Sequence, residues 1–86
     1  STEVDLTKAK VLAKEKVRQA RVPKFQELDI AYQRADEAGD SDTKTAVATK
    51  KQTARDATKN TKITGADSVD NLKTGMEAVI KEVSDL

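Results

Sequence analysis

The stretch "ADEAGDSDTKTAVATKKQTARDATKN", residues 35–60, has the composition of a polar helix and contains only one large apolar side chain, Val47. Its second half predicts a helix over about 43–57 that is rich in alanine and threonine. An isolated helix of this composition is only marginally stable in water. We therefore expect this helix to lie against a neighbour, which its small side chains would let approach closely.

The first half of the stretch predicts a tight turn. Gly39 is typical of the residue that ends a helix, and Asp40 or Ser41 is typical of the residue that caps the next one. A helix over about 24–38 would precede the turn, so the two helices would form an antiparallel hairpin over about 24–57. This preceding helix holds both aromatic residues, and we expect the centre of the core there, at Phe25, Leu28, Tyr32 and Ala35.

The N-terminal segment predicts a long helix with a narrow apolar stripe. Residues 4–21 contain no Gly or Pro, and small apolar residues recur at intervals of three or four. An alanine-rich stripe suits close packing between helices, including a coiled coil. Pro23 then predicts a helix break or a sharp kink, because proline disfavours helix at the residue before it. We expect residues 1–22 to form an extended helical arm, with interface residues Leu6, Ala9, Ala13, Val17 and Ala20.

The C-terminal segment has the clearest amphipathic pattern. Residues 66–86 predict a helix in which Gly75 would permit a close helix crossing, a bend or an early end. The polar segment 58–65 predicts a loop with Ile63 as an anchor. The stripe comprises Val69, Leu72, Met76, Val79 or Ile80, and Val83, and Val79 and Val83 are its expected interface residues. Leu6, Val17, Leu28, Leu72 and Val79 are candidates for contacts with another protein. Ordinary packing within the chain is the alternative for each of them, and for Leu28, Leu72 and Val79 it is the favoured role.

Together these segments predict a single small all-α domain, 1–86, with a thin core. Hydrophobic residues make up 36% of the chain and aromatic residues only 2%. Domains of this size usually need a disulfide, a metal ion or another chain for stability, and the sequence contains no cysteine. We therefore expect the missing stabilisation to come from protein association, as a homo-oligomer, as a complex with a larger protein, or both.

The sign of the charge alternates along the chain. The net charge is +6 over residues 8–24, −5 over 25–42, +5 over 43–64 and −3 over 65–86. Antiparallel helical neighbours would attract one another, within the chain or between copies. The alternative is that these charges only solvate the outer faces of helices.

The residue types argue against an enzyme and against a cofactor. The sequence contains no histidine and no cysteine, so a classical catalytic triad and a thiolate metal site are both excluded. The acidic residues at 40–42 lack the ligand spacing of a calcium loop, and a helix N-cap explains them. Membrane binding is not expected, because no apolar run approaches the roughly 18 residues of a transmembrane helix and the N-terminal stripe is mostly alanine.

Nucleic-acid binding is the alternative function. Two basic segments, 8–24 and 50–62, could contact phosphates. Acidic segments of similar net charge lie beside these basic segments. Neither basic segment contains an aromatic residue that could stack on bases. The candidate anion contacts are Lys10, Lys14, Arg18, Arg21, Lys50, Lys51 and Arg55.

Roughly half of the chain, from residue 28 to residue 73, resembles a segment that recurs in small proteins and C-terminal modules of tailed bacteriophages, often associated with tails or tail fibres. That pattern has Leu-Asp, an aromatic residue, Arg-Ala, a Gly-Asp turn, Lys-Gln-x-Leu-Arg-Asp and a later Leu-Lys. Ala54 departs from it, since the pattern has leucine there. The matching residues are Leu28, Asp29, Tyr32, Arg34, Ala35, Gly39, Asp40, Lys51, Gln52, Arg55, Asp56, Leu72 and Lys73.

The resemblance implies a virion or assembly context rather than a reaction. We therefore expect a non-enzymatic structural component of a tailed-phage virion, made in the host cytoplasm and located in the tail, a fibre or beside the capsid. It would act through helix-mediated contacts with copies of itself or with a larger phage structural protein. A small phage-encoded regulator or accessory protein that binds nucleic acid is the alternative.

Overall fold

A computed structural model describes residues 2–86, and this part of the chain is helical without any strand, as the sequence predicts. The helices form a slender rod with extents of 55 × 17 × 15 Å. Its elements are α1 (Thr2–Ala38), α2 (Ser41–Asp56), a 3-10 turn η1 (Ala57–Lys59), the one-turn helix α3 (Thr61–Thr64) and α4 (Val69–Ser84).

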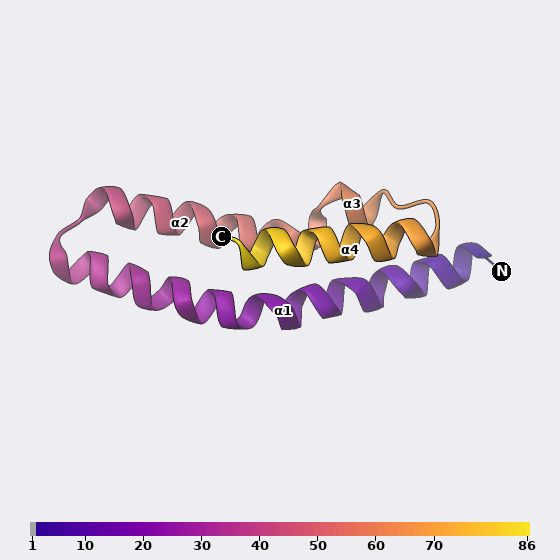
Figure 1. Ribbon diagram of the computed structural model, residues 1–86, viewed down its shortest axis with the longest axis horizontal. Coiled ribbons are helices and arrows are strands. Elements are labelled where there is room, and N and C mark those ends of the chain that lie inside the picture. Colours follow the sequence, from indigo (N-terminus) through magenta and orange to yellow (C-terminus); the bar gives the residue numbers. More distant parts are fainter. Residues whose placement is uncertain (1) are drawn as a thin grey trace.

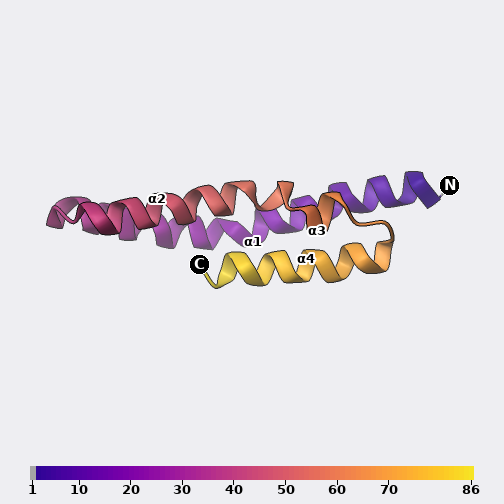
Figure 2. The same cartoon turned by 90° about the horizontal axis from the view of Figure 1, so that it is seen from above.

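The long helix α1 runs the length of the rod, and the other helices pack against it (Figure 1). α2 returns antiparallel to the C-terminal half of α1, whereas α4 runs parallel to the N-terminal half. Seen from above, α4 lies to one side of α1 and α2 (Figure 2). The hairpin end of the rod therefore consists of α1 and α2. At the other end, α1 packs with α3 and α4.

The predicted turn between α1 and α2 is confirmed. Gly39 has φ +69°, which a residue with a side chain rarely adopts, and the Asp40 amide donates to the Ala35 carbonyl over 2.9 Å, which closes the end of α1. The Asp40 carboxylate caps α2 by accepting from the Thr43 backbone N–H at 3.0 Å and from its hydroxyl at 2.5 Å. Local residue chemistry is therefore enough to place this turn.

Charge complementarity and small residues hold the two helices of the hairpin together. Lys44 lies 2.7 Å from Asp36, and Lys51 lies 2.6 Å from Asp29, so the basic helix pairs with the acidic one as the charge pattern predicts. Both lysine ammonium groups also lie over the ring of Tyr32, 5.5 and 5.8 Å from its centroid. The buried seam between the helices comprises Leu28, Ala35, Val47 and Ala54.

The helix break expected at Pro23 is wrong. α1 continues through this exposed residue to Ala38, and Figure 1 shows one gently bowed helix. Proline removes one backbone hydrogen bond from a helix interior. Both flanks of Pro23 are nevertheless held, because Val17 is buried in the main core and Leu28 in the hairpin seam. Tertiary packing therefore outweighs the local preference for a break.

The centre of the core also lies elsewhere than expected. Phe25 is only partly buried and Tyr32 is 37% exposed, whereas Val17, Ile63 and Val79 are the largest fully buried side chains. These three come from α1, α3 and α4, which converge at the N-terminal end of the rod. Two helices alone cannot enclose a large side chain, so the aromatic residues of the hairpin stay partly in solvent.

A close approach of α3 to α4 completes this core. The loop expected at 58–65 is partly wrong, because Asn60 caps the one-turn helix α3 by accepting from the Lys62 amide at 2.9 Å. The predicted anchor Ile63 is confirmed. Of the three roles considered for Gly75, the structure has the close crossing: a Cβ added there would lie 2.1 Å from the Lys62 carbonyl oxygen.

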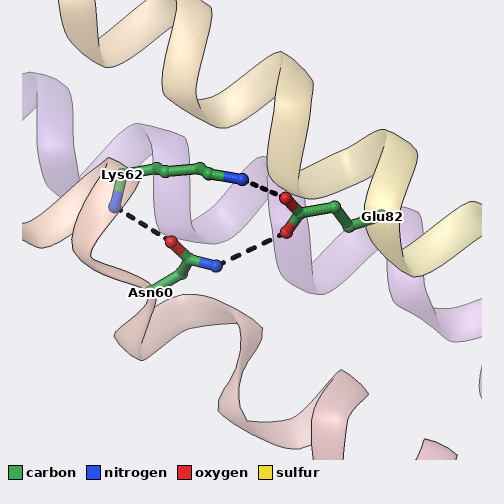
Figure 3. Close-up of polar contacts among 3 residues, drawn as sticks. All are labelled: Asn60, Lys62 and Glu82. Atoms are coloured by element: carbon green, nitrogen blue, oxygen red, sulfur yellow. Dashed lines mark hydrogen bonds and ion pairs between the residues drawn. The ribbon is translucent and has the colours of Figure 1, made fainter.

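Exposed polar contacts also join α3 to α4 at this crossing. The Lys62 ammonium pairs with the Glu82 carboxylate, and the Asn60 side-chain amide donates to that carboxylate over 3.5 Å (Figure 3). Asn60 thus both begins α3 and contacts α4. These exposed contacts contribute little stability individually, but they orient α3 across α4.

Candidate protein-interaction surface

Four of the residues expected at a protein interface are instead core residues of the chain itself. Ala13, Val17, Val79 and Val83 are all at most 4% exposed and belong to one cluster. Ala20 is partly buried, and Leu6 and Ala9 pack against the cluster. The described part of the expected arm 1–22 therefore packs on α3 and α4 rather than extending freely. A stripe predicts that a helix has a neighbour, and here the neighbour is α4.

Two of the candidate anion-binding cations hold helix ends in place. The Lys10 ammonium donates to the Thr64 carbonyl at the end of α3 over 2.9 Å. The Arg21 guanidinium donates to the carbonyls of Ala54 and Arg55 at the end of α2, over 3.2 and 3.0 Å. Positive charge is favourable at a helix C-terminus, where the last carbonyls lack helical donors. These two side chains are therefore engaged in folding contacts.

The other candidate cations divide into paired and unpaired side chains. Lys51 pairs with Asp29 in the hairpin, and Arg18 lies 3.5 Å from Glu15. The Arg55 guanidinium donates to the Gln52 side chain over 3.3 Å. Within residues 2–86, Lys14 and Lys50 form no ion pair. The structure thus brings the two basic segments together through Arg21, whereas Lys10 contacts Thr64, just beyond the second segment.

A groove with exposed apolar walls lies between α1 and α4. We call this the α1–α4 groove, and its volume is about 250 Å³. Leu12 is 65% exposed and Val69 is 51% exposed, so its apolar walls face solvent. Lys16 on α1 and Lys73 on α4 also line it. The full lining is Ala9, Leu12, Ala13, Lys16, Val69, Leu72, Lys73 and Met76.

Sequence reasoning did not identify this groove. Leu12 only broadens the apolar stripe of the N-terminal helix, and Lys16 and Lys73 belong to no motif. The groove exists because α4 packs on the Ala13–Val17 side of α1 and leaves Leu12 at its edge. The sequence did contain one signal for the groove. Leu12 is a large aliphatic residue that lies about 100° around the helix from Ala13, and therefore outside the apolar stripe.

The described residues include no buried polar or charged side chain and no cluster of acidic residues that could hold a metal ion. Hydrogen bonds from Thr43 lower the pKa of Asp40, and hydrogen bonds to carboxylates raise the pKa of Lys44 and of Lys81. Each of these shifts stabilises a surface ion in its ordinary charged form.

Comparisons with known proteins identify no relative. No family model, no curated protein and no solved structure matches the chain. Among the described helices, none combines the length and apolar character that crossing a membrane requires.

Proposed function

We propose that this chain is a non-enzymatic assembly protein that binds other protein through the α1–α4 groove. The observation that carries this proposal is that Leu12 and Val69, both more than half exposed, line the same groove on a highly charged rod. Burying such aliphatic side chains stabilises a complex by roughly 25 cal/mol per Å² of apolar surface. An accessible apolar groove with a polar rim is the usual anatomy of a helix-binding surface.

The proposed setting is the virion of a tailed bacteriophage, with a larger phage structural protein, a second copy of the chain, or both as partners. The support is the resemblance described above. Several of its residues have clear packing or capping roles, since Gly39 and Asp40 form the hairpin turn and Asp29 and Lys51 pair across it. On this proposal the hairpin is a rigid scaffold, and the chain is made in the host cytoplasm before it joins the particle.

The test is incorporation into particles. A tailed phage whose genome encodes the chain would be purified, and the chain would be detected by immunoblotting after the particles are washed in high salt. We expect retention of the wild type, loss of Leu12→Glu and retention of Val11→Glu. Val11 is the matched control, because it is also exposed on α1 and does not line the groove. Absence of the wild-type chain from washed particles would contradict the virion role.

Nucleic-acid binding is the second candidate function. The observation in its favour is that the contacts of Arg21 with the Ala54 and Arg55 carbonyls bring segments 8–24 and 50–62 side by side. Fluorescence anisotropy with a labelled DNA duplex at two salt concentrations tests it, since phosphate contacts give an affinity that falls steeply with salt. A Lys14→Gln/Lys50→Gln double variant, which spares every ion pair of the described chain, should weaken DNA binding if this function holds.

A further inference from the structure

The rod contains two separately packed units, and we infer that it is hinged between them at the level of Pro23. The hairpin of α1 and α2 then swings as one body relative to the bundle of α1, α3 and α4. The hinge is the segment 20–24 of α1, together with the end of α2 that lies beside it. This inference is independent of the proposed function, because it concerns the shape of the rod and not what binds to it.

The buried side chains fall into two groups that do not join. The main core cluster includes Val17 on α1, whereas the hairpin seam, which begins on α1 at Leu28, lies outside that cluster. Residues 18–27 of α1, between these two positions, include no buried side chain. Folded proteins open and bend most easily where few apolar side chains are buried. The two cores can therefore move relative to one another without either of them being exposed.

Both chain segments that cross this level of the rod have weakened helical hydrogen bonding. Pro23 has no N–H, so the carbonyl of Gln19, four residues earlier in α1, receives no helical hydrogen bond from it. Proline is a common cause of bending in long helices. The returning chain changes from α2 to the 3-10 turn η1 at Asp56, and such changes often mark hinges. The contacts of Arg21 with the end of α2 place this change beside the Pro23 turn of α1.

The third helix of the bundle does not brace the hinge. α4 ends at Ser84, beside the middle of α1 (Figure 1), so it packs on one unit and does not reach along the other. A pocket of about 170 Å³ separates this end of α4 from α1, and Pro23 and Ser84 both line it. The packing around Pro23 therefore leaves room for a change in the angle of α1.

Arg21 is the side chain that limits the swing. Its guanidinium donates to the carbonyls of Ala54 and Arg55 over 3.2 and 3.0 Å, and so joins α1 to the end of α2 at the hinge itself. Hydrogen bonds from a charged donor are stronger than those between neutral groups. Bending at Pro23 in the direction that separates α1 from α2 has to lengthen these two contacts.

The test is the distance between two spin labels on α1, measured by pulsed electron paramagnetic resonance. The native chain has no cysteine, so labels attached at Lys8→Cys and Gln33→Cys report these positions alone. Both residues are exposed. They lie on either side of Pro23, about 37 Å apart along a straight helix. A second pair, Lys8→Cys with Glu77→Cys on α4, lies within the bundle and gives the width expected of a single rigid body. Circular dichroism confirms that each labelled chain is folded.

We expect the Lys8–Gln33 distance distribution to be at least about two-fold wider than the Lys8–Glu77 distribution, because only the first pair spans the hinge. Pro23→Ala should narrow it to the width of the second pair. Arg21→Gln should widen it further. Arg18→Gln is the matched control and should leave the width unchanged, since the ion pair of Arg18 is with Glu15 on α1 itself.

Two results would overturn the hinge. One is a wild-type Lys8–Gln33 distribution as narrow as the Lys8–Glu77 distribution, which would show that the rod is rigid. The other is a wide distribution that Pro23→Ala leaves unchanged, because the motion would then arise elsewhere in the chain. An Arg21→Gln distribution as wide as that of the wild type would overturn the role of Arg21.

Discussion

The substitution Gly75→Ala tests whether the close crossing of α3 and α4 holds the fold together. Gly75 is interior to α4 and buried. In an ordinary exposed helix this change stabilises by up to about 1 kcal/mol, because alanine is the better helix former. Here the new Cβ would lie 2.1 Å from the Lys62 carbonyl oxygen and 2.9 Å from the Lys62 carbonyl carbon. These are backbone atoms, so no side chain can rotate away to relieve the clash.

The size of the expected loss follows from what must move. The Lys62 carbonyl has to retreat by about 1.3 Å to reach 3.4 Å, the lower end of ordinary van der Waals contact. That movement carries the next residue, Ile63, which is fully buried, partly out of the core. Full burial of an isoleucine side chain is worth roughly 1.5–3 kcal/mol. After subtraction of the helix-propensity gain, we expect Gly75→Ala to lower the free energy of unfolding by roughly 0.5–2 kcal/mol.

The assay is urea denaturation followed by circular dichroism at 222 nm. With a slope of about 1 kcal/mol per M urea for a small domain, the midpoint should fall by roughly 0.5–2 M. Glu77→Ala and Glu77→Gly are the matched controls, since Glu77 is an exposed interior position of α4, and the alanine variant should be the more stable by about 1 kcal/mol. A midpoint for Gly75→Ala above that of the wild type would refute the reasoning.

Three further predictions concern single sites. Pro23→Ala should leave helicity unchanged, because α1 is already continuous, yet raise the free energy of unfolding by up to roughly 3 kcal/mol, since it restores a backbone hydrogen bond and removes the clash of the proline ring. A clear gain in helicity by circular dichroism would instead show that Pro23 interrupts α1. Ile63→Ala should destabilise by roughly 2–5 kcal/mol, measured by urea denaturation, because it leaves a cavity at a fully buried position; a loss under 1 kcal/mol would show that α3 is peripheral. The contacts of Thr43 lower the pKa of Asp40, so the stability that this carboxylate contributes is present above its unfolded pKa and is lost as pH falls through its lower folded pKa. The melting temperature of Asp40→Asn should therefore lie below that of the wild type at pH 7 and approach it at the most acidic pH, and a gap that widens with acid would contradict the capping role.

The parts of the fold that could be predicted are those governed by local chemistry. Gly39 and Asp40 specify the turn because a positive φ favours glycine and an exposed helix start favours a short acceptor side chain. The pairing of Asp29 with Lys51 was predictable at the level of segments, because opposite net charges on two helices joined by a short turn must lie side by side. Neither inference needs knowledge of distant parts of the chain.

The parts that could not be predicted depend on which surface each helix meets. Val17, Val79 and Val83 have the same pattern whether their neighbour is another helix of the chain or another molecule, and the structure places them in the internal core. Lys10 and Arg21 look like free cations, because the carbonyl groups that they bind are backbone atoms common to every residue. The residue pattern alone therefore could not decide whether these side chains form an interface with another protein, pack in the core or bind an anion.

The sequence by itself determined the helical content, the position of the hairpin turn and the attraction between its two helices, because hydrophobic spacing, capping and net charge act over a few residues or over whole segments. Only the tertiary structure decided that α1 continues through Pro23, that the core centres on Ile63 and that Gly75 is required for the α3–α4 crossing. It also created the α1–α4 groove beside Leu12. Each of these features depends on atoms from elements far apart in the chain, whose combined packing energy exceeds the local preferences of any one residue.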